Sequence, residues 1–372
     1  MSSEWTYLKP SQPLSLPGNP RIQRIGLFKF RNIGDVLLMT PAIRAIREAF
    51  PKARITAIVN SETDAMLQGN PHLDEILIYD RSKRKGIERL QNEFRFFREV
   101  RRRHFDLTVN LVSGERPAWC SLFSGAKWRV TYYNWWPFWS WYHLAYTQTY
   151  RYPTQTLHQV PFQYFLLKQL GIPTPLDSVP TTENRLELVV AENDQIWAEQ
   201  FLYRHGIQKF VHIHPVSRWL FKCWDDLRMA QVIDWIQESL KLGVVLTCGP
   251  EEKEKAKAQR ILDLCRIKPL SVLGQVSLKQ TAALIQKSEV FLGVDTAPMH
   301  MAAALGRPVI ALFGPSGVGD WAPWSENRLI LNKGCPCGPN LQEGCDHHGL
   351  RACMKAITIE DVKEALEATV GR

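Results

Sequence analysis

Residues 295–314, DTAPMHMAAALGRPVIALFG, are the most informative stretch of this chain. The apolar run Val290–Val294 predicts a buried strand that ends at Asp295. Pro298 suits the first turn of a following helix, because its fixed φ matches helical geometry. A second apolar run, residues 309–313, predicts another buried strand. Strand, polar turn, short helix and strand make half of a nucleotide-binding α/β unit, whose helix N-terminus can receive a diphosphate.

Two polar residues, Asp295 and His300, flank the point where such a diphosphate would lie. They fit a site for the phosphates or the sugar of a nucleotide ligand. An ordinary strand–helix–strand corner fits the same spacing equally well, so these residues alone leave both interpretations open.

A second motif covers residues 24–50, RIGLFKFRNIGDVLLMTPAIRAIREAF. Its apolar start predicts a strand, and Gly34 in the following turn would let a ligand approach the backbone closely. Asp35 then begins a helix at the carboxyl end of that strand, where a carboxylate can act as a general base or serve only as a helix cap. Thr40 and Pro41 predict a break or kink in the helix.

Apolar strands alternate with helical patterns in both halves of the chain. Strands are expected at residues 22–30, 54–59, 75–79 and 105–111, and then at 210–214, 243–248, 270–273, 289–294 and 308–313. This alternation predicts parallel sheets with helices on both faces. Residues 171–182 are rich in proline and read as a linker. The expected parts are an N-terminal extension (1–20), two Rossmann-like domains (21–175 and 183–345) and a C-terminal segment (346–372).

Together the motifs resemble the lipopolysaccharide heptosyltransferases, the inverting glycosyltransferase family that uses ADP-heptose. The runs GDVLLMTPAIRAIR (34–47) and DTAPMHMAAALGRPVIALFGP (295–315) are typical of this family. A third run, HPVSRWLFKCW (214–224), is most similar to its heptosyltransferase III branch. The resemblance implies the GT-B architecture, in which two Rossmann-like domains face a cleft. It assigns the acceptor to the first domain and the nucleotide sugar to the second, and returns the last helix to the first domain.

The resemblance also implies the chemistry of the site. Asp35 would take a proton from the acceptor hydroxyl, and Lys222 would neutralise the diphosphate leaving group without a metal. Glu251 would accept from a ribose hydroxyl, although an acid favoured by a helix N-terminus explains it equally well. The expected acceptor-side residues are Asn32 and Gly34, and the expected donor-binding residues are Ser217, Arg218, Lys222, Trp224, Gly249, Glu251, Asp295, Thr296, Ala297, Pro298, Met299 and His300. No cofactor and no metal ligand is expected.

Composition narrows the partners. The 372 residues carry a net charge of +9 and a pI near 9.1, which favours anionic partners. No nucleic-acid-binding motif is present, so an anionic membrane or a phosphorylated glycolipid is expected. Residues 81–103 hold ten Lys or Arg against three Glu, which fits a solvated helix face or a surface that attracts lipid phosphates. We find no signal peptide and no membrane-spanning run, so we expect a cytoplasmic protein attached peripherally to the inner membrane of a Gram-negative cell.

The sequence leaves open the roles of a cysteine cluster and an aromatic run. Cys335, Cys337, Cys345 and Cys353 invite a zinc site, but their spacing lacks paired C-x-x-C, so a folded loop with buried thiols is the expectation. Residues 132–146, YYNWWPFWSWYHLAY, fit a membrane interface, a sugar-stacking surface or plain core equally well.

The sequence as a whole predicts a metal-independent, inverting transfer of L-glycero-D-manno-heptose from ADP-heptose to a heptose of the lipopolysaccharide inner core. Transfer to another glycan or to a protein is an alternative within the same class. A non-catalytic nucleotide-sugar binding protein is the alternative from a different class, and the carboxylate at Asp35 argues against it.

Overall fold

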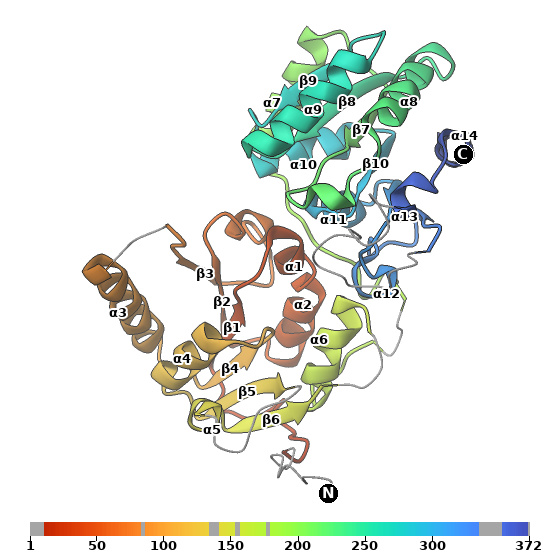
Figure 1. The fold of residues 1–372 in the computed structure, drawn as a ribbon. Coiled ribbons are helices and arrows are strands. Elements are labelled where there is room, and N and C mark those ends of the chain that lie inside the picture. Colours follow the sequence, from red (N-terminus) through yellow and green to blue (C-terminus); the bar gives the residue numbers. More distant parts are fainter. Residues whose placement is uncertain are drawn as a thin grey trace, which may run out of the picture. The chain divides into compact units, whose positions relative to one another are not determined.

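The computed structural model describes residues 11–82, 86–133, 141–152, 157–175, 179–334 and 352–370. The chain divides into two compact units, Met1–Ser178 and Val179–Arg372 (Figure 1). Each unit contains one six-stranded parallel sheet, and helices lie on both of its faces. The predicted fold class, two Rossmann-like parallel-sheet domains, is therefore confirmed. In the described part of the chain, no helix combines the length and the apolar character needed to cross a membrane.

The first sheet has the strand order β3-β2-β1-β4-β5-β6. Its order reverses between β1 and β4, which is where open α/β sheets place their ligands, at the carboxyl ends of the strands. Its strands are β1 (Arg24–Lys29), β2 (Arg54–Asn60), β3 (Glu75–Tyr79), β4 (Leu107–Asn110), β5 (Trp128–Tyr133) and β6 (Gln148–Arg151).

Helices cover both faces of this sheet. One face carries α1 (Ile33–Leu37), α2 (Thr40–Ala49) and α6 (Gln159–Lys168), and the other carries α3 (Gly86–Arg102), α4 (Glu115–Ser124) and α5 (Tyr142–Ala145). A short 3-10 helix, η1 (Asp64–Met66), follows β2. The predicted break before Pro41 is present, because α1 ends at Leu37 and α2 begins at Thr40.

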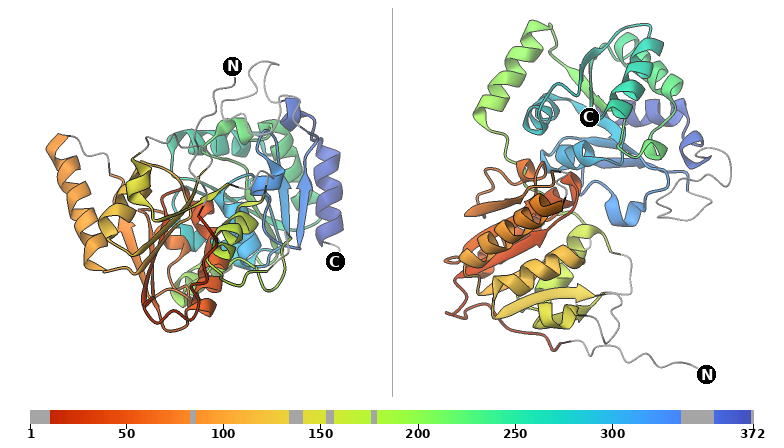
Figure 2. Two further views of the ribbon diagram at one scale, coloured as in Figure 1. Left: turned by 90° about the horizontal axis from the view of Figure 1, so that it is seen from below. Right: turned by 60° about the vertical axis from the view of Figure 1, so that its left-hand side comes forward.

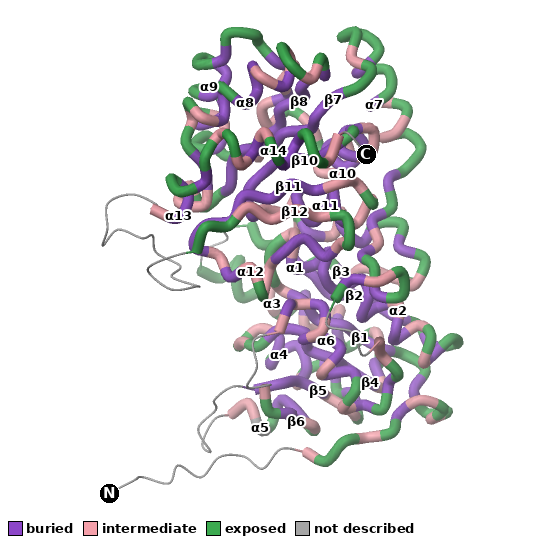
Figure 3. Tube along the Cα trace, turned by 90° about the vertical axis from the view of Figure 1, so that its right-hand side faces the viewer, coloured by how far each residue is buried: buried purple, intermediate pink, exposed green. Residues whose placement is uncertain are grey.

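The second sheet repeats the same winding, with the order β12-β11-β10-β7-β8-β9. Its order reverses between β7 and β10. The four central strands are buried along most of their length, whereas the edge strands β9 and β12 are mostly intermediate (Figure 3). The strands are β7 (Phe210–His214), β8 (Gly243–Cys248), β9 (Leu270–Leu273), β10 (Val290–Val294), β11 (Val309–Leu312) and β12 (Arg328–Leu331).

The helices of the second unit fall into two groups. Those that pack with the main core cluster are α8 (Asp226–Glu238), α9 (Glu252–Leu264) and α14 (Ile359–Val370). Those that pack with one another elsewhere are α7 (Glu192–Arg204), α10 (Leu278–Lys287) and α11 (Ala297–Ala304). Shorter elements are η2 (Leu220–Lys222), α12 (Val318–Trp321) and α13 (Ala352–Lys355).

The last helix, which is expected to return to the first domain, packs on the second unit. Val362 and Leu366 of α14 are buried in the core of the second unit, where the helix contacts α8 and β12. The indole of Trp224 also donates to the carbonyl of Ile357, 3.1 Å away, just before this helix. Apolar packing and this hydrogen bond therefore hold α14 to the second unit.

Helix α3 has an apolar face that is not packed against the rest of its unit. Ile87, Leu90 and Phe94 share one face, yet their side chains are 72%, 60% and 71% exposed. Only Phe96 and Val100 are buried on this helix. In Figure 2, α3, coloured orange, stands at the edge of the first unit. Its N-terminal half thus presents an apolar face to the surroundings, flanked by arginines.

Candidate functional site

An ion pair marks the point where the strand order of the second sheet reverses. Asp295 directly follows β10, and Lys222 ends η2 in the loop after β7. The ammonium of Lys222 lies 2.6 Å from Oδ2 of Asp295. The two side chains are only 22% and 9% exposed, so solvent screens their attraction less than that of a surface pair. The sequence predicts a donor-site role for both residues, and the structure brings them together.

Close packing of the two strands makes this arrangement possible. Gly293 precedes the end of β10 and lies beside β7. A Cβ atom at this position would come within 2.8 Å of the carbonyl oxygen of His214, which is closer than real Cβ contacts. A larger residue at position 293 would therefore push apart the two strands that carry the ion pair.

Helix α11 begins immediately after this pair. Thr296 is its N-cap residue, with extended backbone, and its side chain does not cap the helix. Thr296 and Ala297 are partly exposed, whereas Pro298, Met299 and His300 are buried. The first N–H groups of the helix are thus available to an anion, and the helix dipole favours negative charge there. Met299 is fully buried, so its side chain supports the helix rather than facing a ligand.

Of the site residues predicted in the loop after β7, some are buried and support the loop, and others carry its charge. Trp224 is buried and belongs to the core of the second unit. Ser217 is also buried, and its backbone N–H donates to Sγ of Cys223 at 3.3 Å. Arg218 is exposed, with its guanidinium 6.0 Å from the centre of the Trp219 ring. Trp224 and Ser217 therefore shape the loop, and Arg218 and Lys222 supply its charge.

The first turn of α9, which follows β8, contains a buried carboxylate that the sequence motifs do not indicate. Glu254 packs over Gly249, where a Cβ atom would collide with its carboxyl group. Burial raises the pKa of Glu254, and the charge of Glu251 adds to this effect. Glu251 itself is half exposed and pairs with Lys253 at 3.2 Å. Since Glu251 is also the N-cap residue of α9, its helix-terminal role is present in the structure.

Two buried histidines, His212 and His214, lie on β7 of the second sheet. His212 Nε2 and His214 Nδ1 each lie 2.9 Å from the hydroxyl of Thr247 on the neighbouring strand β8. Burial lowers the pKa of each ring to about 3, so both are neutral at pH 7. One hydroxyl can donate only once, so it donates to one ring and accepts from the other. This bond network fixes the end of β7, which leads into the loop of Lys222.

In the first unit, Asp35 is the third residue of α1, which follows β1 after a short turn. Its side chain is buried, and Oδ2 accepts a hydrogen bond of 3.3 Å from the backbone N–H of Asn32. Asn32 is the N-cap residue of α1, and Asp35 contributes to the cap as the third residue of the helix, in a capping box. The second carboxylate oxygen makes no hydrogen bond with any described residue, so it can accept a proton from a bound hydroxyl. Nearby, Asn32 is exposed and Gly34 is partly exposed.

A buried lysine near Asp35 escapes the sequence analysis. Lys29 ends β1, is only 2% exposed, and donates to the carbonyl of Leu111 at 3.1 Å. Leu111 follows β4, so this bond joins the two strands between which the first sheet reverses. Burial lowers the pKa of Lys29 to about 8, while the charge of Asp35 raises it and that of Arg31 lowers it. At neutral pH, Lys29 thus places a positive charge beside the candidate base.

The two open clusters of the sequence are only partly described. Cys353 is buried against Gly314, whereas Cys335, Cys337 and Cys345 lie outside the described residues. Within the ranges that the structure describes, no three His, Cys, Asp or Glu side chains are grouped to hold a metal ion. Of the aromatic run, residues 134–140 also lie outside. Tyr132, Tyr133 and Tyr146 are buried, which supports core for this part of the run.

Comparison with known proteins identifies the family. The model of glycosyltransferase family 9 (heptosyltransferase) matches residues 93–350. The chain is 31% identical over 302 residues to lipopolysaccharide heptosyltransferase 3 of Escherichia coli, covering 80% of this chain and 85% of that protein. It is 28% identical over 345 residues to the protein of the same name from E. coli strain K12, covering 90% and 94%.

Solved structures share the fold. A glycosyl transferase of family 9 from Veillonella parvula superposes with a TM-score of 0.80 at 22% identity, over 97% of this chain and 99% of that one. The E. coli ADP-heptose LPS heptosyltransferase II superposes with a TM-score of 0.73 at 18% identity, over 94% and 98%. The resemblance inferred from the three motifs is thus confirmed. Because the family model matches well over half of the sequence, the chain belongs to glycosyltransferase family 9, the heptosyltransferases.

Proposed function

We propose that this protein transfers L-glycero-D-manno-heptose from ADP-heptose to a heptose of the lipopolysaccharide inner core, with inversion at the anomeric carbon. The observation that carries the proposal is the Lys222–Asp295 pair at the N-terminus of α11, at the reversal point of the second sheet. A cation and a helix N-terminus at one point suit a diphosphate. The two relatives above are named for the same reaction class.

In this mechanism the second unit holds the donor. Lys222 and the first N–H groups of α11 contact the diphosphate and stabilise the negative charge that grows as ADP leaves. Asp295 orients Lys222 and, with His300, contacts the heptose. Arg218 adds a further positive charge from the loop after β7. Lys222 and the helix N-terminus then do what a divalent cation does in other transferases, so the reaction proceeds without a metal.

The first unit supplies the base. Asp35 accepts the proton of the acceptor hydroxyl as that oxygen attacks the anomeric carbon. We infer that Lys29 is a positioning residue, because its bond to Leu111 fixes the end of β1, from which the chain leads to Asp35. An ionised carboxylate is the form that can accept a proton.

Two alternatives to this function can be distinguished by experiment. Transfer to another glycan or to a protein would use the same donor residues, because these contact only ADP-heptose. A non-catalytic nucleotide-sugar binding protein would not need a buried carboxylate such as Asp35 in the first unit.

The acceptor is anchored in lipid, so we also propose that the protein acts on the cytoplasmic side of the inner membrane and attaches peripherally through α3. The exposed Ile87, Leu90 and Phe94 form an apolar face, and exposed Arg95 and Arg98 lie on the same helix. An amphipathic helix with basic residues beside an apolar face binds anionic membrane surfaces.

Mass spectrometry of lipopolysaccharide core from a deletion strain tests the proposed function. We expect the core to lose the mass of one heptose together with any sugars attached to it, and a plasmid copy of the gene to restore both. An unchanged core would contradict the proposed acceptor. A changed glycoprotein or a different glycan in the same strain would identify the alternative acceptor.

A further inference from the structure

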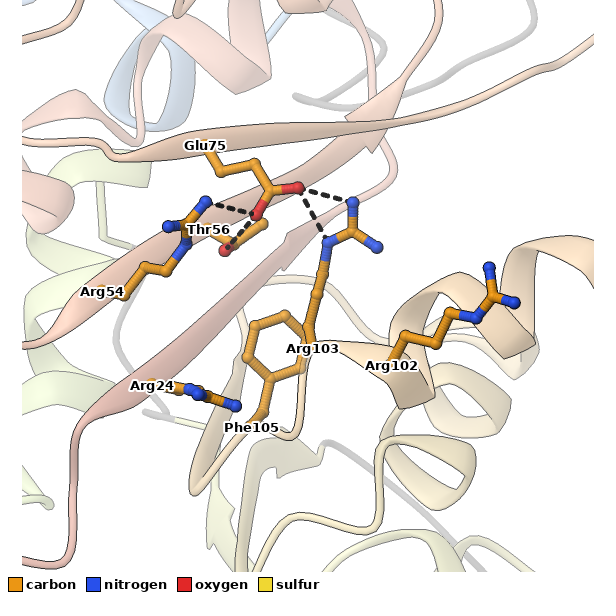
Figure 4. A pocket seen from close by; sticks show the side chains of 7 residues that line it. All are labelled: Arg24, Arg54, Thr56, Glu75, Arg102, Arg103 and Phe105. Atoms are coloured by element: carbon orange, nitrogen blue, oxygen red, sulfur yellow. Dashed lines mark hydrogen bonds and ion pairs between the residues drawn. The ribbon is translucent and has the colours of Figure 1, made fainter.

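A pocket of about 260 Å³ lies in the first unit, at the edge where β1, β2 and β3 begin (Figure 4). Four arginines and one glutamate line it, together with a threonine and a phenylalanine, so positive charge is in excess. The lining residues are Arg24, Arg54, Thr56, Glu75, Arg102, Arg103 and Phe105. Asp35 follows the opposite end of β1, roughly 20 Å away for a strand of this length. The pocket is therefore separate from the proposed base.

The sheet register builds one wall of this pocket. Arg24 on β1 lies directly opposite Arg54 on β2, and Thr56 lies opposite Glu75 on β3. Alternate residues of a strand share a face, so these four side chains all point toward α3. The C-terminal end of α3 supplies Arg102, with Arg103 directly after it.

An aromatic ring forms the floor. Phe105 is buried and packs on β1, where a Cβ atom at Gly26 would lie 3.1 Å from its ring. Glycine at position 26 therefore lets the ring approach the strand. The pocket thus combines an apolar floor with a charged rim, and its walls come from the sheet and from α3 (Figure 4).

Part of the charge is neutralised within the pocket. The guanidinium of Arg103 donates to Oε1 of Glu75 at 2.5 Å and to the backbone carbonyl of Glu99 at 2.6 Å. Its role is therefore to hold Glu75 and to cap α3. Glu75 offers its other oxygen to Arg54 at 3.5 Å and to Thr56 at 3.4 Å, so its contact with Arg54 is long.

The remaining arginines keep donors to spare. Arg102 pairs with Glu99 at 2.9 Å, and the side chain of Arg24 makes no hydrogen bond or ion pair with any described residue. Each guanidinium carries five N–H donors. Like charges directly opposite on neighbouring strands also repel, as Arg24 and Arg54 do. An anion between them would satisfy the free donors and remove the repulsion.

We propose that this pocket binds a phosphomonoester group. Guanidinium groups match phosphate oxygens with paired hydrogen bonds, and a dianion neutralises the excess charge of Arg24, Arg54 and Arg102. The volume is below the roughly 300–1,000 Å³ of sites for drug-sized ligands and suits a headgroup-sized anion. The phosphate can belong to a soluble ester or to a lipid headgroup, and the experiment distinguishes these sources.

The test uses the full chain with saturating ADP, which occupies the proposed donor site. Calorimetry measures the binding of glycerol 3-phosphate to the wild type and to the double variant Arg24→Gln/Arg54→Gln. We expect the variant to bind at least about tenfold more weakly, because each hydrogen bond to a charged group contributes substantially. The matched control is Arg21→Gln/Lys52→Gln, which removes two exposed charges near the same sheet edge without touching the pocket.

The control should bind glycerol 3-phosphate like the wild type. Equal binding by wild type and Arg24→Gln/Arg54→Gln, or equal loss in the control, would overturn the proposal. Thermal unfolding reports whether the double variant folds, and the single variant Arg24→Gln serves if it does not.

Vesicles then identify the source of the phosphate. We compare phosphatidylcholine vesicles that contain either phosphatidic acid, a phosphomonoester, or phosphatidylglycerol, a phosphodiester. If Arg24→Gln/Arg54→Gln loses binding to vesicles with phosphatidic acid but not to vesicles with phosphatidylglycerol, the pocket binds lipid headgroups. A loss of glycerol 3-phosphate binding with unchanged vesicle binding assigns it to soluble esters.

Discussion

Lys222 donates a 2.6 Å hydrogen bond to Asp295, and this pair spans the two strands between which the second sheet reverses. Asp295 fixes the ammonium in position, so a diphosphate that arrives at α11 meets a preorganised cation. Preorganised charge stabilises a leaving group more effectively than charge that must first be ordered. The role of Lys222 in the proposed mechanism can therefore be tested by removing its charge while keeping its length.

For Lys222→Met we predict that kcat/KM for ADP-heptose falls by about 10²–10³, the usual effect of removing one group that stabilises transition-state charge. Steady-state assays of ADP release measure this. Lys287→Met is the matched control, because Lys287 forms a comparable ion pair with Glu199 on the surface of the same unit.

If the reaction needs no metal ion, the wild type should keep its activity in EDTA. Inhibition by EDTA that magnesium or manganese reverses would contradict a metal-independent mechanism.

For Asp35→Asn we predict that turnover falls by about 10²–10⁴ while ADP-heptose affinity changes little. Asparagine keeps the size of the side chain and can still accept from the N–H of Asn32, but it cannot take a proton. Asp64→Asn removes a carboxylate elsewhere in the first unit and should leave turnover unchanged. Near-normal turnover in Asp35→Asn would remove this residue from the mechanism.

For Lys29→Met we predict a loss of activity that is not caused by a loss of stability. Burial lowers the pKa of Lys29 in the folded protein to about 8, against an ordinary lysine pKa of 10.5, because it disfavours the charged form. Below pH 8 the lysine is charged in both states, so its burial lowers the free energy of unfolding by about 3 kcal/mol. Between pH 8 and 10.5 the unfolded state binds more protons, so this penalty disappears as pH rises.

Urea unfolding at pH 7 and pH 10.5 measures this effect. The stability of Lys29→Met relative to wild type should be about 3 kcal/mol greater at pH 7 than at pH 10.5. Lys168→Met, which changes an exposed lysine of α6, should show no such difference. A pH-independent difference for Lys29→Met would show that this ammonium is not buried. Full activity in a stable Lys29→Met protein would show that it does not position the base.

For the triple variant Ile87→Ser/Leu90→Ser/Phe94→Ser we predict weaker binding to anionic vesicles and an unchanged free energy of unfolding. These side chains are largely exposed, so the core does not lose their packing. Ile196→Ser/Tyr203→Ser changes exposed apolar residues of α7 and should bind like the wild type. Wild-type binding should also weaken as salt rises, because charges are screened beyond about 8 Å at physiological ionic strength. Vesicle binding that the α3 variant retains would place membrane contact elsewhere.

The sequence predicts the sheets well where strands are buried on both faces. Val290–Val294 is a nearly continuous apolar run, and Phe210–His214 combines three apolar residues with two histidines; the structure places strands at both. It misses β5, β6 and β12, since Gln148–Arg151 and Arg328–Leu331 are short and carry polar or charged residues. Edge position explains this for β6 and β12, because an edge strand needs less apolar sequence.

The site is predictable only as far as its residues belong to motifs. Lys222 and Asp295 are identified although 73 positions separate them, because each lies in a run typical of the family. Lys29 is not, since a lysine within an apolar strand does not reveal its burial or its bond to Leu111. The contacts of His212 and His214 with Thr247 likewise depend on the register of β7 and β8. The motif likewise does not reveal that the indole of Trp224 lies in the core.

Analysis of the product that the purified protein forms tests the proposed heptose transfer most directly. Incubation with ADP-heptose and isolated inner-core acceptor should release ADP and add the mass of one heptose to the acceptor. Nuclear magnetic resonance should show the new glycosidic bond with the anomeric configuration opposite to that of the donor, and Asp35→Asn should form almost none of it. ADP-heptose binding without transfer to any inner-core acceptor, or a product that retains the donor configuration, would contradict the account.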